Sequence, residues 1–127
     1  MAEPTKVHVP LGERAYDIFI GPDLLESAGG RLKAMFPGRR FGIVTDSEVA
    51  KAQMPRLTRS LDAAGLKHSA VVVPNGEASK SIARLNEVVE GLLEAKLERG
   101  EIVLAFGGGV IGDLAGFAAA VTRRGMD

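Results

Sequence analysis

The stretch Leu104-Ala-Phe-Gly-Gly-Gly-Val-Ile-Gly-Asp-Leu-Ala-Gly-Phe117 decides the fold of this chain. An apolar strand is predicted to run into three consecutive glycines and then into a helix with an aspartate near its start. Glycine permits a positive φ and lets a ligand approach with no Cβ in the way. A helix start offers unpaired N–H groups and the positive end of the helix dipole. The stretch therefore predicts an anion site of the kind that binds phosphate or pyrophosphate.

The glycines also have the spacing of a dinucleotide-binding turn. Gly107, Gly109 and Gly112 satisfy the pattern G-x-G-x-x-G, which is normally followed about 20 residues later by an acidic residue that holds a ribose. The sequence stops at Asp127, before a further strand could present such an acidic residue. Either this is no nicotinamide site, or the residue that holds the ribose lies earlier in the chain. Asp46 ends another short apolar strand. Because strand ends share one edge of an open α/β sheet, Asp46 and the glycine loop are predicted to share a crevice.

Composition excludes several classes of function. The 127 residues predict one domain, and 16 basic residues balance 16 acidic ones, which gives no support to binding of nucleic acid or an anionic membrane. With no cysteine there is no disulfide or thiol nucleophile, and the N-terminus lacks the apolar run of a signal peptide, so we expect a cytoplasmic protein. Residues 102–121 are long enough to cross a bilayer, but Asp113 and the glycines favour a strand, a turn and a helix.

Strands and helices are predicted to alternate along the chain. A hairpin with the turn Gly12-Glu13-Arg14 comes first, and short connections between later elements indicate an α/β fold, a Rossmann-like parallel sheet flanked by helices. Ser47 is expected to cap a helical segment that Pro55 restarts. The expected strands are 7–11, 16–20, 40–45, 68–73 and 102–106, and the other helices are 22–34, one capped by Ser79 or Ser81 that stops at Gly100, and one after the glycine loop.

Two features of the last helix stand out. Gly112, Gly116 and Ala120 fall on one face, which suits close approach of a ligand, a strand or a second subunit, or tight packing on the helix's own sheet. Gly125 is expected to cap the helix, and the residues after it read as the first residues of a further structural element. We therefore expect this chain to be a piece of a longer protein.

Four segments in order resemble the 3-dehydroquinate synthase family of the shikimate pathway, which belongs to the sugar phosphate cyclases. These segments are residues 11–21, Thr45-Asp46, Pro74-Asn-Gly-Glu-Ala-Ser-Lys-Ser81, and residues 107–119 running on to Arg124-Gly125. The resemblance covers the whole chain but only the N-terminal domain of that family. It implies that residues 1–127 form the NAD-binding α/β domain of a two-domain enzyme whose metal-binding helical domain is absent here.

The resemblance also implies roles for single residues. Asp46 corresponds to the carboxylate that holds the adenosine ribose, Glu77 and Lys80 to a pair at the NAD site, and Asp113 to a carboxylate near the nicotinamide end. Arg124 corresponds to an arginine that reaches the substrate phosphate in the neighbouring subunit's site. The full cofactor-binding set is Asp46, Asn75, Gly76, Glu77, Lys80, Gly107, Gly108, Gly109, Val110, Ile111, Gly112 and Asp113.

By the same resemblance, the full-length enzyme converts 3-deoxy-D-arabino-heptulosonate 7-phosphate to 3-dehydroquinate and phosphate as a homodimer. It uses NAD and a divalent metal, zinc or cobalt, whose ligands lie beyond this chain, so the chain alone is expected to be inactive. A related NAD- and metal-dependent polyol dehydrogenase and a non-catalytic nucleotide-binding module are the alternatives. Without the resemblance, Glu77 and Lys80 pass for a solvated pair, and His8 and His68 for ordinary strand positions.

Overall fold

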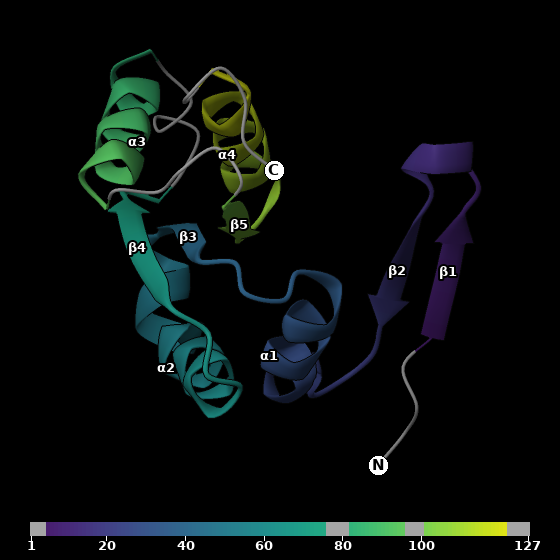
Figure 1. Ribbon diagram of the computed structural model, residues 1–127. Coiled ribbons are helices and arrows are strands. Elements are labelled where there is room, and N and C mark those ends of the chain that lie inside the picture. The colour runs from purple at the N-terminus through teal and green to yellow at the C-terminus, as the bar shows by residue number, and fades with distance from the viewer. Residues whose placement is uncertain (1–4, 76–81, 96–100, 122–127) are drawn as a thin grey trace.

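The structure is a computed structural model that describes residues 5–75, 82–95 and 101–121. The chain opens with an antiparallel hairpin of β1 (Thr5–Val9) and β2 (Tyr16–Ile20), joined by a short 3₁₀ turn, Gly12–Arg14. Gly12 has a φ of +61°, which a glycine adopts without strain. The first strand ends earlier than predicted because the Leu11 N–H turns back to the Val9 carbonyl. In Figure 1 the hairpin stands to one side of the remaining elements.

The centre of the molecule is a three-stranded parallel sheet in the order β4-β3-β5. Its strands are β3 (Phe41–Asp46), β4 (His68–Val73) and β5 (Ile102–Phe106). All six residues of β3 are buried, as expected for a strand covered by helices on both faces. The predicted α/β class, parallel sheet and N-terminal hairpin are confirmed.

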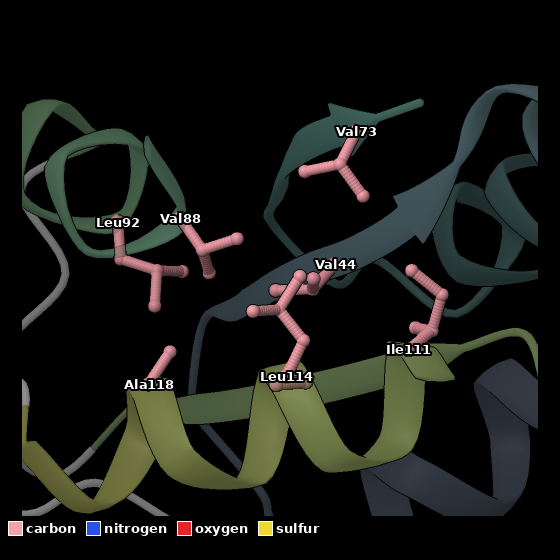
Figure 2. Packing of buried hydrophobic residues seen from close by; sticks show 8 residues of the cluster. Val44, Val73, Val88, Leu92, Ile111, Leu114 and Ala118 are labelled. Atoms are coloured by element: carbon pink, nitrogen blue, oxygen red, sulfur yellow. The ribbon is translucent and has the colours of Figure 1, made fainter. Parts of the chain in front are cut away.

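Two pairs of helices cover the sheet. On one face, α1 (Leu24–Met35) and α2 (Ser47–Ala63) pack in a cluster built around Phe41 and Ile43. On the other face, α3 (Ile82–Glu94) and α4 (Gly109–Val121) pack around Val44. Figure 2 shows the second cluster, in which side chains from both helices point toward the strands. The helices within the described ranges are all too short or too polar to span a bilayer.

Several helix boundaries differ from those that the sequence predicts. Helix α1 begins at Leu24 rather than at Pro22, because Asp23 takes a left-handed conformation that no helix continues through. Pro55 does not restart a helix: α2 runs through it, held by the buried side chains of Leu57 and Leu61. Helix α3 ends at Glu94. The expected capping residues Ser79 and Ser81 and the stop at Gly100 lie outside the described residues.

Helices α1 and α2 cross closely because Gly29 has no side chain. A Cβ at this position would lie 2.1 Å from the Ser60 carbonyl oxygen. The Gly29 N–H donates to Ser60 Oγ at 2.8 Å, and that hydroxyl donates to the Glu26 carbonyl at 3.1 Å. The crossing is therefore fixed by hydrogen bonds as well as by apolar packing.

Glu101 fastens the amino-terminal end of β5 to β3. Its Oε2 accepts the Arg40 backbone N–H at 2.6 Å, and its Oε1 accepts Arg40 Nε at 3.1 Å. These hydrogen bonds lower the pKa of Glu101 below its ordinary value of about 4.5, and the bond from the Arg40 backbone N–H has the largest effect. The ionised carboxylate thus stabilises the folded sheet.

We predict that this stabilisation depends on pH. Because the folded pKa of Glu101 is depressed, its contribution is fully present above the unfolded pKa and is lost as pH falls through the folded value. Glu101→Gln should lower the free energy of unfolding by about 1 kcal/mol at pH 7 and by less at pH 3. Urea denaturation of both proteins across this range measures the difference. A gap that stayed constant with pH would contradict the assignment.

Candidate functional site

A pocket of about 180 Å³ opens at the carboxyl end of the sheet. It lies where β3 passes into α2 and β5 passes into α4, and these two helices cover opposite faces of the sheet. Such a point, where neighbouring strands send their helices to opposite sides, is where open α/β sheets bind ligands. Its lining residues are Asp46, Pro74, Asn75, Gly108, Gly109, Val110 and Ile111.

Among the described residues that line this pocket, Asp46 is the only one with a charged side chain. It is 7% exposed, and its Oδ1 accepts the Val49 N–H at 2.8 Å. Asp46, not Ser47, is therefore the N-cap of α2, which holds the carboxylate in one orientation. None of the described residues donates a hydrogen bond to its second oxygen.

The glycine loop forms the opposite wall. A Cβ on Gly107 would lie 3.0 Å from Ile111 Cγ1, whereas Gly108 and Gly109 face open space. None of the three has a positive φ, so the loop does not use the left-handed conformation that glycine permits. The Gly112 N–H bonds to the Gly108 carbonyl, which leaves the preceding N–H groups without a partner in the helix. The loop thus needs glycine for close approach and not for its dihedral angles.

The structure brings together part of the predicted cofactor set. Asp46, Asn75 and the helix start from Gly108 to Ile111 line one pocket. Gly107 lies behind it against Ile111, while Gly112 and Asp113 are exposed on α4 and do not line it. The remaining predicted residues, Gly76, Glu77, Lys80 and Arg124, lie outside the described residues.

Comparison with known proteins agrees with this geometry. Residues 70–127 match the family model described as 3-dehydroquinate synthase N-terminal. The chain is 55% identical over 98% of its length to the 3-dehydroquinate synthase of Rhodopseudomonas palustris strain BisA53, and 50% identical over 98% to that of Mesorhizobium japonicum. The chain is homologous to the N-terminal domain of 3-dehydroquinate synthase. It spans about a third of these relatives, 32% and 33% of their lengths.

Two solved structures of sugar phosphate cyclases share the fold. A 2-deoxy-scyllo-inosose synthase, complexed with carbaglucose-6-phosphate, NAD⁺ and Co²⁺, superposes with a TM-score of 0.82 at 20% identity, over 96% of this chain and 33% of that one. A 2-epi-5-epi-valiolone synthase from Streptomyces hygroscopicus subsp. jinggangensis, with NAD⁺ and Zn²⁺ bound, gives 0.75 at 31% identity, over 93% and 32%.

The small-residue face of α4 does not pack on the helix's own sheet. The buried residues of this helix are Ile111, Leu114, Ala115, Ala118 and Ala119. Gly112 and Gly116 lie on the other side, where nothing comes within 4 Å of an added Cβ, and Phe117 beside them is 59% exposed. Within the described part of the chain this face is therefore open.

The histidines lie outside the pocket. His8 Nδ1 is 2.8 Å from an Asp17 carboxylate oxygen, and His68 Nε2 is 2.9 Å from one of Asp62. Residues 5–75, 82–95 and 101–121 contain no group of three or more His, Cys, Asp or Glu side chains placed to hold a metal ion.

Sequence reasoning missed two contributors to the pocket. Pro74 lines it, although only its neighbours in the motif were singled out. Thr45 lies beneath it, fully buried, and its hydroxyl donates to the Phe106 carbonyl at 2.6 Å. The available signal was a hydroxyl at the end of an otherwise apolar strand, since a buried hydroxyl requires a partner.

Gly107 and Gly108 are predicted to tolerate alanine differently. Gly107→Ala should lower the free energy of unfolding by about 1–3 kcal/mol, because the new methyl crowds the buried Ile111 side chain. Gly108→Ala faces open space and should change it by less than about 0.5 kcal/mol. Chemical denaturation of the two variants gives the comparison, and equal losses would contradict the close approach at Gly107.

Proposed function

We propose that this chain is the NAD-binding domain of a 3-dehydroquinate synthase. The observation that carries the proposal is the pocket in which a fixed carboxylate, Asp46, faces the start of α4. A carboxylate accepts hydrogen bonds from two ribose hydroxyls, and a helix start binds phosphate oxygens. A nucleotide presents both groups within one short span.

The residues present fit a dinucleotide. Asp46 would bind the adenosine ribose through its free carboxylate oxygen, and the N–H groups of Gly109 and Val110 would donate to the pyrophosphate. The open space at Gly108 and Gly109 admits the phosphates close to the backbone. NAD, when bound, supplies a hydride acceptor for oxidation of a substrate hydroxyl.

The pocket is smaller than the whole cofactor. Sites for drug-sized ligands span about 300–1,000 Å³, so a volume of about 180 Å³ suits one ribose and its phosphate. The rest of the cofactor needs other residues, and Glu77, Lys80 and Asp113 remain our candidates. We therefore expect the chain alone to bind NAD weakly.

The complete reaction belongs to a longer enzyme. We propose that it converts 3-deoxy-D-arabino-heptulosonate 7-phosphate to 3-dehydroquinate and phosphate, in the cytoplasm, as a homodimer with a divalent metal. Arg124 is proposed to bind the substrate phosphate of the neighbouring subunit. The curated relatives at 50–55% identity are 3-dehydroquinate synthases, which supports this activity over that of a polyol dehydrogenase.

Asp46→Asn tests the cofactor role without removing the helix cap, since asparagine caps as well as aspartate. Loss of the charge should weaken NAD binding by roughly tenfold or more, the range for hydrogen bonds to charged groups, with little change in melting temperature. Isothermal titration with NAD measures this. Asp62→Asn, which changes an aspartate outside the pocket, serves as the control. Equal affinity of Asp46→Asn and the unsubstituted chain would refute the ribose role.

A chimera tests the catalytic activity. Residues 1–127 would replace the corresponding third of the Rhodopseudomonas palustris enzyme, which is 55% identical over the exchanged region. We expect phosphate release from the heptulosonate phosphate by the chimera, a marked reduction in its Asp46→Asn version, and none from residues 1–127 alone. A folded, metal-loaded chimera that released no phosphate would remove the synthase proposal.

A further inference from the structure

Side chains fasten β5 to β3 at both ends of the strand pair. At the carboxyl end, the Thr45 hydroxyl donates to the Phe106 carbonyl at 2.6 Å. At the amino end, Glu101 accepts two hydrogen bonds from Arg40. In the described part of the sheet β5 has no other strand neighbour, so these bonds and the β3 ladder set its position.

The two sets of side-chain hydrogen bonds between β3 and β5 differ in what lies next to them. Thr45 immediately precedes Asp46, and Phe106 immediately precedes the glycine loop. The Thr45 bond therefore joins the bases of the two pocket walls. The Arg40–Glu101 pair lies at the opposite end of the same strands, away from the pocket.

We propose that Thr45 is a positioning residue for the nucleotide site. It lies outside the pocket lining and is fully buried, so it acts by holding the glycine loop at a set distance from the Asp46 carboxylate. A short O–H···O bond in a dry interior has little freedom to lengthen. This inference rests on the proposed function for its ligand but not for its geometry.

A purely structural role for Thr45 predicts a different outcome. If the hydroxyl only stabilised the sheet, removing it would resemble removing the Glu101 charge at the other end. Thr45→Val keeps the shape of the side chain and deletes the hydroxyl, while Thr45→Ser keeps the hydroxyl. Glu101→Gln is the matched control, because it weakens the same strand pair at a distance from the pocket.

The experiment measures NAD affinity and backbone amide chemical shifts of the 127-residue chain, at a temperature where all variants are folded. Thr45→Val should weaken NAD binding roughly threefold to tenfold and shift the amide resonances of residues 107–111. Thr45→Ser should keep the NAD affinity and the loop amide resonances close to those of the unsubstituted chain. Glu101→Gln should lower the melting temperature with affinity unchanged within about twofold.

Each outcome decides the question. Unchanged affinity and unshifted loop amides in Thr45→Val would overturn the positioning role, and so would an equal loss of affinity in Glu101→Gln. If the unsubstituted chain does not bind NAD, the proposed cofactor fails, and the amide shifts still decide whether Thr45 holds the loop.

Discussion

The pairing of β3 with β5 is the constraint on which the rest of this structure depends. The residue pairs run from Phe41 opposite Ile102 to Thr45 opposite Phe106. This register sets where each strand ends, and therefore where the following helix starts. A shift by one residue would move the glycine loop along the sheet and exchange the side chains that β5 presents to its two faces. The pocket is thus a product of strand register before it is a product of any functional side chain.

The two helix starts beside the pocket are chemically different, and in the proposed function this difference selects the kind of ligand. Helix α2 is capped by the Asp46 carboxylate, so a negative charge already occupies its positive end. Helix α4 begins after Gly108, which has no side chain to act as a cap. The start of α4 carries no such negative charge, so its N–H groups suit an external anion better than those of α2 do. In the proposed function, the carboxylate that caps α2 also binds the hydroxyls of a ligand whose phosphates lie at the start of α4.

The sequence predicted the sheet, its layers and the two walls of the pocket, because these depend on local patterns. Apolar runs that end in Asp46 and in Gly107 identify parallel strands, and strand ends in such sheets share an edge. Two features of α2 were predicted wrongly: its N-cap is Asp46 and not Ser47, and the helix runs through Pro55 without a break. The cap is a local choice between two neighbouring residues that both favour the N-cap position, which the pattern alone does not decide. The unbroken helix depends on tertiary packing: Leu57 and Leu61 are buried against the sheet and hold the helix together across the proline. Thr45 was missed for the same reason, since its partner lies 61 residues away in the chain.

The structure shows which property of glycine the loop uses. The spacing of Gly107, Gly109 and Gly112 predicted a ligand-binding turn, and glycine there permits either a positive φ or a close approach; the loop has no positive φ. Gly107 allows Ile111 to pack closely against it, and Ile111 is buried between α4 and the sheet. The glycine thus lets the helix start come down onto the end of β5. That contact, together with the Thr45 hydroxyl bond, brings the free N–H groups of α4 into the pocket that the Asp46 carboxylate lines. Close packing on one side of the glycine loop therefore positions the N–H groups that, in the proposed function, bind a charged ligand on the other.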